Sequence, residues 1–185
     1  MDRLDPQTSL LLVVDLQERL AAAIPPAIFE RAVSNSLALL EAARLLDVPV
    51  LASEQYPKGL GATVPPIAEK LRGLGVVPVD KVTFDALAEP RIASAIGDRA
   101  PRAVVLVGVE AHICVFQTAR ELCRRGIDVR VMADAVASRR DENRLLGLSM
   151  CERAGALAMP TEAALFDWLG RAGTDEFRAI SKLVR

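Results

Sequence analysis

Short apolar runs alternate along the chain with longer segments of helical periodicity. The run at residues 9–14, Ser-Leu-Leu-Leu-Val-Val, is apolar on both faces and stops at Asp15. This pattern is typical of a central strand in a parallel sheet, because a strand with one face in water would alternate apolar and polar positions. Five later runs are also predicted to form strands, at residues 48–52, 76–79, 103–109, 128–133 and 156–159.

Segments of helical periodicity lie between several of these runs. Apolar residues recur at helical spacing over residues 29–46, in a segment entered after two consecutive prolines. A second helix is predicted over residues 115–125, where Gly126 supplies the expected C-terminal stop.

Polar residues are predicted to begin two later helices. Ser138 and Asp141 have the spacing of a capping box that would open a helix through Arg153, and Thr161 would cap the next helix. Repeated strand–helix units predict a parallel sheet with helices on both faces, a three-layer α-β-α sandwich. No repeat or interdomain linker interrupts the pattern, so residues 1–185 are predicted to form a single domain.

Composition argues against several classes of function. Apolar residues make up 51% of the chain and charged residues 25%, as in ordinary globular proteins. The formal net charge is -1 and the basic residues are scattered, so no partner nucleic acid is expected. The apolar runs are too short to span a membrane, and the first residues lack the pattern of a secretory signal. Three cysteines without regular spacing argue against a disulfide framework and favour the reducing cytoplasm.

One long connection stands out at residues 54–66, where it contains three prolines and two glycines. Long loops inside a compact domain are usually functional. This loop follows the carboxyl end of a predicted strand, the side on which α/β sheets bind ligands. We therefore expect it to line a binding site.

Three residues with reactive side chains also follow predicted strands. Asp15 ends the first strand, Lys81 follows the third, and Cys114 stands where the helix after the fourth strand begins. Unpaired N–H groups and the helix dipole at such a position favour an anion, which predicts that the pKa of the Cys114 thiol is lowered. Lys81 would add a positive charge, and Asp15 could accept the thiol proton and later return it.

Each of these residue types also has an ordinary structural role. An aspartate at a strand end often caps a turn, and most lysines are solvated surface groups. A free cysteine is commonly a small buried hydrophobic residue, which is the role expected for Cys123 and Cys151. His112, the only histidine, could pair with Cys114 as a base, but we expect it to orient a loop or line the pocket.

The reactive residues stand in segments that resemble the signatures of the isochorismatase-like cysteine hydrolases. These segments are Val-Val-Asp-Leu-Gln at 13–17, Lys-Val-Thr-Phe at 81–84 and Gly-Val-Glu-Ala-His-Ile-Cys-Val-Phe-Gln-Thr at 108–118. Further similar segments lie at 54–61, 131–139 and 177–183. The match covers nearly the whole chain and is closest to the subgroup called isochorismatase domain-containing proteins.

The resemblance implies a six-stranded parallel sheet in the order 3-2-1-4-5-6, with Asp15 and Cys114 beside the point where the strand order reverses. It implies an Asp15–Lys81–Cys114 triad that cleaves a C–N or C–O bond of a small molecule through a covalent intermediate on Cys114. It also implies a cis peptide bond between Val109 and Glu110. The backbone N–H groups of Glu110 and Cys114 would then form an oxyanion hole.

Five residues are expected to line the substrate site, namely Gln55, Tyr56, Phe84, Glu110 and His112. We expect the enzyme to be a homo-oligomer, a dimer or larger, and to need no cofactor. Asp134 and Arg139 are instead expected to fix local structure.

Relatives of the nicotinamidase type hold a metal with an Asp and histidines after the second strand. This chain has Ser53, Glu54 and Gln55 there and no histidine, so a metal-independent enzyme is predicted. Two other functional classes are compatible with a sheet of this type. A catalytically idle interaction protein could retain the same fold. A nucleotide-binding oxidoreductase is disfavoured, because no glycine-rich phosphate loop follows the first strand.

Overall fold

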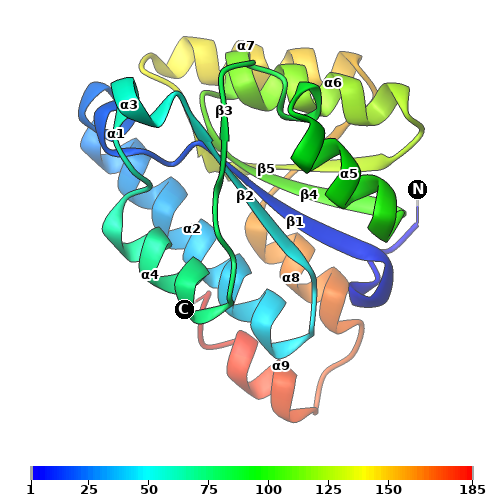
Figure 1. The fold of residues 1–185 in the computed structure, drawn as a ribbon. Coiled ribbons are helices and arrows are strands. Elements are labelled where there is room, and N and C mark those ends of the chain that lie inside the picture. Colours follow the sequence, from blue (N-terminus) through cyan, green and yellow to red (C-terminus); the bar gives the residue numbers. More distant parts are fainter. Residues whose placement is uncertain (1, 185) are drawn as a thin grey trace.

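The structure is a computed structural model that describes residues 2–184 and shows the expected α-β-α layers (Figure 1). All strands of the sheet are parallel and follow the order 3-2-1-4-5-6, which confirms the predicted topology. The strands are β1 (Ser9–Val14), β2 (Val50–Gln55), β3 (Val79–Lys81), β4 (Ala103–Val109), β5 (Asp128–Ala137) and β6 (Leu157–Met159).

Helices cover both faces of this sheet (Figure 1). One layer holds α5, α6 and α7, the other holds α2, α4, α8 and α9, and α1 and α3 lie at the carboxyl ends of the strands. Within residues 2–184, no helix is both long and apolar enough to cross a bilayer. The helices are α1 (Glu18–Ala23), α2 (Pro26–Leu45), α3 (Pro57–Leu60), α4 (Pro65–Gly73), α5 (Pro90–Arg99), α6 (Phe116–Arg124), α7 (Asp141–Arg153), α8 (Thr161–Leu169) and α9 (Asp175–Ile180).

Strand β1 is the centre of the core because both of its faces are buried. Leu11 and Val13 pack into the layer of α2, whereas Leu10, Leu12 and Val14 pack into the layer of α5 and α6. Residues 10–14 of this strand are all apolar because both of their faces pack against apolar helix layers, and the interpretation as a central strand is confirmed.

Strand β3 begins later than the predicted range of residues 76–79. The N–H of Val76 donates to the carbonyl of Leu71 at the end of α4, and Pro78 has no N–H to give to a strand ladder. The strand therefore covers only Val79–Lys81.

Helices α1, α3, α4 and α5 were not predicted from the periodicity of the sequence. Helix α4 buries only Ile67 and Leu71, and α5 only Ile92 and Ile96. A single buried pair repeats the helical period once, which is too little to distinguish a helix from a loop in the sequence.

Neither predicted side-chain cap is present, so both of those expectations were wrong. Helix α7 begins after Arg140, whose side chain makes no capping bond. Ser138 Oγ instead accepts a hydrogen bond from the N–H of Ala111 at 3.2 Å. Thr161 is already inside α8, and its N–H and Oγ1 donate to Asp134 Oδ1 at 2.9 and 2.7 Å. Both residues tie distant segments together, and Asp134 fixes local structure as expected.

Candidate active site

Asp15 and Lys81 form an ion pair inside the protein. Lys81 Nζ lies 2.7 Å from Asp15 Oδ2, and both side chains are 0% exposed. Ser53 Oγ donates to the other carboxylate oxygen, Oδ1, at 2.7 Å. Both oxygens of this carboxylate, which follows β1, are therefore held by donors from β2 and β3.

The ammonium group of Lys81 has three acceptors, which equals its number of N–H bonds. Besides Asp15, it donates to Gln55 Oε1 at 2.6 Å and to the carbonyl of Thr83 at 3.2 Å. A buried charge is tolerated only when it is paired and hydrogen-bonded, and Lys81 meets both conditions.

Both ends of the Gln55 side-chain amide are hydrogen-bonded within the protein, although Gln55 was predicted to line the substrate site. Its Nε2 donates to the carbonyl of Val82 at 2.9 Å, while its Oε1 accepts from Lys81. Its backbone exchanges hydrogen bonds with the side chain of Gln17, whose Nε2 also reaches the carbonyl of Gly61. The observed contacts of Gln55 thus orient Lys81. Gln17 was not singled out from the sequence, although it lies two residues after Asp15 in a matched segment.

The backbone turns through left-handed conformations where β1 and β2 end. Asp15 has φ of 53° and Tyr56 has φ of 38°. Aspartate tolerates this region better than most residues, whereas a bulky tyrosine rarely occupies it. Such positions gather at functional sites, where the surrounding structure holds them in place.

Cys114 lies in the first turn of the helix that follows β4. This turn (Ala111–Val115) is π-helical and continues directly into α6, so the helix begins before the predicted residue 115. The peptide bond between Val109 and Glu110 is cis, as the resemblance implied.

Gly108 allows β4 to approach β1 closely just before this turn. Its φ is 122°, and a Cβ atom at this position would lie 1.9 Å from the carbonyl oxygen of Val14. Only glycine combines this backbone conformation with so close an approach. The absence of a side chain at Gly108 is therefore required where β4 ends beside β1.

The electrostatic environment of Cys114 is opposite to the one predicted. The residue is only 5% exposed, and burial, followed by the neighbouring Asp15 carboxylate, raises the pKa of its thiol to about 12. Lys81 lowers this pKa, but to a smaller extent. The predicted lowering was wrong because Asp15 balances the charge of Lys81 and because the helix start is buried.

The other two cysteines occupy ordinary packing positions, as predicted. Cys151 is buried, and its burial raises the pKa of its thiol to about 12. Cys123 is half-buried against the same core, and burial also raises its pKa.

Glu110 and His112 are bound to residues that follow β5. Arg139 donates its N–H and Nε to the Glu110 carboxylate at 2.9 and 3.1 Å. The His112 ring lies 3.1 Å from Ser138 Oγ through Nδ1 and 3.4 Å from Asn143 Nδ2 through Nε2. These contacts anchor the π-helical turn to the start of α7, and they give Arg139 the structural role expected for it.

Gly147 was missed by the sequence analysis, although it lies where α7 touches the π-helical turn. A Cβ atom on Gly147 would lie 2.6 Å from the backbone nitrogen of His112 and 2.7 Å from the carbonyl carbon of Ala111. A glycine in the middle of a helix destabilises it and usually has a packing reason. The position of Gly147 inside the predicted helix could therefore have indicated a close contact.

Tyr56 and Phe84 lie outside the buried network and are about half exposed. The N–H of Tyr56 donates to the carbonyl of Lys81 at 2.8 Å, which places it directly beside the ion pair. A small pocket of about 270 Å³ opens here. Its lining residues are Tyr56, Pro57, Lys58, Asp80, Lys81, Val82 and Glu89.

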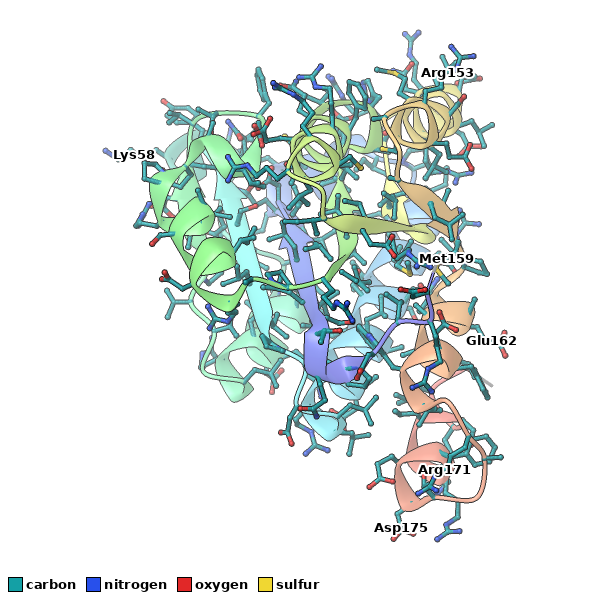
Figure 2. The ribbon with its side chains drawn as sticks, turned by 90° about the vertical axis from the view of Figure 1, so that its right-hand side faces the viewer. Lys58, Arg153, Met159, Glu162, Arg171 and Asp175 are labelled. Carbon is teal, nitrogen blue, oxygen red and sulfur yellow. The ribbon has the colours of Figure 1, made fainter. Side chains whose placement is uncertain are left out.

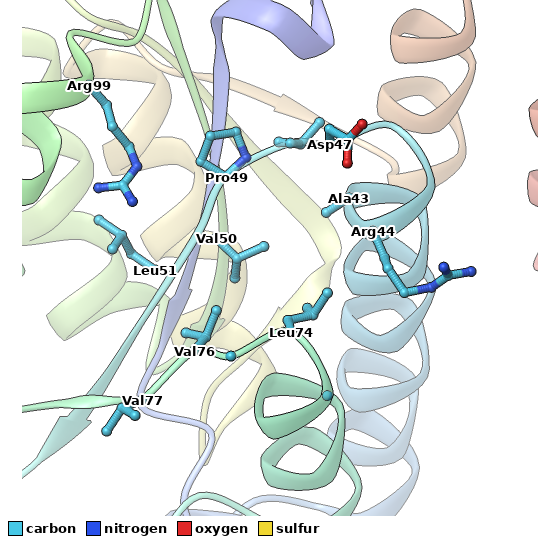
Figure 3. A pocket seen from close by; sticks show the side chains of 13 residues that line it. Ala43, Arg44, Asp47, Pro49, Val50, Leu51, Leu74, Val76, Val77 and Arg99 are labelled. Atoms are coloured by element: carbon cyan, nitrogen blue, oxygen red, sulfur yellow. The ribbon is translucent and has the colours of Figure 1, made fainter.

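A larger hollow of about 630 Å³ lies at the opposite edge of the sheet (Figure 3). It is lined by Val50 and Leu51 at the start of β2, by Val76 and Val77 after α4, and by Arg99 among others. Parallel sheets bind ligands at the carboxyl ends of their strands, whereas this hollow lies at the amino end of β2. The candidate active site is therefore the group formed by Asp15, Lys81 and Cys114.

Comparison with known proteins identifies the family. The sequence profile described as the isochorismatase domain matches residues 9–163. The chain belongs to the isochorismatase domain family. Members of this family are hydrolases, and the family expected from the sequence is confirmed.

Relatives of the isochorismatase domain family match almost the whole chain. Isochorismatase domain-containing protein 2 of Danio rerio is 38% identical over 186 residues, covering 98% of this chain and 89% of the relative. A solved structure described as the MAR1 ribonuclease of Caenorhabditis elegans is 37% identical, has a TM-score of 0.90 and covers 98% and 92% of the two chains. The Escherichia coli YcaC structure, described as an octameric hydrolase of unknown specificity, has a TM-score of 0.88 at 20% identity, covers 98% and 90%, and shows the fold alone.

Isochorismatase-like enzymes of the nicotinamidase type hold a metal after the second strand, but the residues here do not fit one. Ser53 donates to Asp15, and Glu54 Oε1 accepts from both the N–H and the Oγ1 of Thr63 at 2.6 Å. Gln55 is bound at both ends of its amide. Among residues 2–184, no three His, Cys, Asp or Glu side chains gather as metal ligands would.

Proposed function

We propose that this protein is a cysteine hydrolase that cleaves a C–N or C–O bond of a small molecule through a covalent intermediate on Cys114. The single observation that supports this proposal most is a buried thiol beside a buried Asp15–Lys81 ion pair. Removing two charges from water costs desolvation free energy, which an ion pair with only a structural role seldom recovers. Buried charges beside a thiol are a common arrangement for activating a nucleophile.

In this proposal Asp15 is the general base. A thiol whose pKa is about 12 is protonated at neutral pH, so its proton must leave as the sulfur attacks. For an amide substrate, Cys114 Sγ bonds to the carbonyl carbon while its proton moves to Asp15. Lys81 and Ser53 hold the carboxylate in position for this transfer.

The proton taken from the thiol then goes to the leaving group. The C–N bond breaks as Asp15 returns the proton to the departing amine, which leaves a thioester on Cys114. Water attacks the thioester, its proton passes to Asp15, and the C–S bond breaks. Asp15 gives this proton from water to the sulfur, which restores the thiol, and the carboxylic acid leaves. Each acid–base step of this kind contributes roughly 100- to 10,000-fold to a rate.

We further propose that the backbone N–H groups of Glu110 and Cys114 hold the oxyanion. Both residues belong to the bend between β4 and α6, where a helix start offers N–H groups without intrahelical acceptors. Loss of one donor in a comparable oxyanion hole costs about 100- to 1,000-fold in rate. Tyr56, which lines the neighbouring pocket, and the half-exposed Phe84 are proposed to contact the substrate.

We propose a small organic substrate rather than RNA, although the C. elegans relative is described as a ribonuclease. RNA binding needs positive charge for the phosphates, and the chain has a formal net charge of -1. The cation nearest the thiol, Lys81, is already paired with Asp15. We also infer a homo-oligomer, by analogy with the octameric E. coli neighbour, and a reducing compartment such as the cytoplasm, because Cys114, Cys123 and Cys151 are unpaired.

One screen tests the proposed function. Small amides, hydroxamates and enol ethers, with a fluorescent RNA oligonucleotide as a separate arm, would be incubated with the wild type and with Cys114→Ala. The expected result is turnover of a small molecule by the wild type alone, with an acyl adduct on Cys114 seen by mass spectrometry at short times. RNA cleavage by the wild type but not by Cys114→Ala would show that the substrate is RNA and not a small molecule. Failure of Cys114 to react with any substrate or electrophile would indicate the idle interaction protein instead.

A further inference from the structure

Helix α7 exposes an apolar surface on the side that faces away from the sheet. Leu148 and Cys151 point inward and are buried. Leu145, Leu146 and Met150 point outward, with 55%, 60% and 36% of their surface exposed. Isolated exposed leucines are ordinary, but three large apolar residues within two turns of one helix mark a contact surface.

Charges of opposite sign flank this surface. Glu142 is exposed in the first turn of α7, and Arg153 is exposed in its last turn. Within residues 2–184, neither side chain takes part in a salt bridge. Figure 2 shows Arg153 at the outside of the molecule, on the helix layer that holds α7.

The order of residues on this face is complementary to itself when the helix is reversed. An antiparallel copy centred between Gly147 and Leu148 brings Glu142 opposite Arg153. The same rotation brings Leu145 opposite Met150 and Leu146 opposite Ser149. The charges attract and the apolar side chains meet, as a contact between identical surfaces requires.

We propose that α7 packs antiparallel against α7 of a second copy of this chain, about a two-fold axis through the middle of the helix. Leu145, Leu146 and Met150 form the apolar centre of the contact, and two Glu142–Arg153 pairs close its ends. A second copy is favoured over an unrelated partner for one reason. When the helix is reversed against itself, opposite charges face each other and the apolar Leu145 faces the apolar Met150. The contact lies on the back of the helix whose inner face packs on the π-helical turn through Gly147.

Charge reversal tests the arrangement without any assay of activity, so its outcome is independent of the proposed function. Sedimentation velocity of the full chain over a range of concentrations would give the dissociation constant of the dimer. Glu142→Arg and Arg153→Glu each place like charges across the axis, and each should weaken the contact by about ten-fold or more. The double variant Glu142→Arg/Arg153→Glu should restore it. Glu162→Arg, on α8 in the other helix layer, is the matched control and should have no effect.

Cross-linking tests the same geometry independently. Ser149→Cys, in a Cys123→Ser background, should give a covalent dimer with a short bismaleimide, and mass mapping should find the linker joining position 149 to itself. Ser94→Cys, exposed on α5, should not. A chain that is monomeric at every concentration would overturn the proposal. So would an oligomer whose double charge variant is no tighter than the single variants.

Discussion

Lys81 Nζ donates to Asp15 Oδ2 at 2.7 Å, and neither side chain touches solvent. The two residues are 66 positions apart in the chain, and their strands are separated by β2. Burial raises the pKa of the Cys114 thiol most, and this ion pair acts on the thiol as well, because Asp15 raises its pKa further and Lys81 lowers it.

The first prediction separates the two effects of Asp15. Asp15→Asn removes the base and should lower kcat/KM by about 100- to 10,000-fold. It also leaves the charge of Lys81 unbalanced, which should lower the pKa of Cys114 and make alkylation at pH 8 faster than in the wild type. Rates of turnover and of iodoacetamide labelling check both outcomes.

Asp98→Asn is the control, because Asp98 is exposed on α5 and lies outside the pocket beside Lys81. It should change neither rate. Near-normal turnover in Asp15→Asn would assign the role of base to His112 instead. Slower alkylation would contradict the prediction that Asp15 raises the pKa of the thiol.

The second prediction concerns pH. Since the pKa of Cys114 is raised to about 12, the thiol is neutral at pH 7 and its thiolate fraction grows only as the pH rises well above 9. Iodoacetamide should therefore label the half-buried Cys123 before Cys114 at pH 7, and labelling of Cys114 should still be rising at pH 10. Peptide mass mapping over a pH series measures this. A plateau of Cys114 labelling below pH 8 would contradict the pKa direction.

The third prediction tests Gln55 as the residue that positions Lys81. Gln55→Leu keeps the volume but leaves an N–H of Lys81 without its acceptor, which should cost about 1–3 kcal/mol of unfolding free energy. Gln7→Leu, an exposed position, should stay within about 0.5 kcal/mol of the wild type. Urea denaturation of the three proteins gives the comparison, and equal losses in both variants would refute the role.

The fourth prediction compares two helical glycines. Gly147→Ala would push a methyl group against the backbone of Ala111 and His112, so it should cost about 1–3 kcal/mol and reduce turnover. Gly97→Ala, in exposed helix α5 with open space around it, should instead add about 0.4–1 kcal/mol. Thermal or urea unfolding distinguishes them. A stabilising Gly147→Ala would mean that α7 does not press on the π-helical turn.

The fifth prediction is that exhaustive chelation leaves turnover unchanged. The side chains of Ser53, Glu54 and Gln55 are already bound to Asp15, Thr63 and Lys81. The measurement is the initial rate after dialysis against EDTA, with and without added divalent metal. Loss of activity that zinc restores would show that these side chains rearrange to bind a metal.

The sequence by itself determined the elements in which buried apolar positions recur at short, regular intervals along the chain. Residues 10–14 are apolar on both faces, which identifies a central strand in a parallel sheet. Asp15 and Cys114 each follow a strand that its apolar run predicts, so their place near the sheet could also be predicted. The strand order and the cis peptide at Val109 came from the resemblance and not from periodicity, and both are present in the structure.

Only the tertiary structure decided which polar groups meet. Ser138 and Thr161 have the chemistry of helix caps, yet they bond to Ala111 and Asp134 because the folded chain offers those partners instead. The pKa of Cys114 is the clearest case. Its place at a helix start predicts a lowered value, but the sign is set by burial and by a carboxylate 99 positions away in the chain. Desolvation and long-range charge are properties of the assembled core, so no local pattern encodes them.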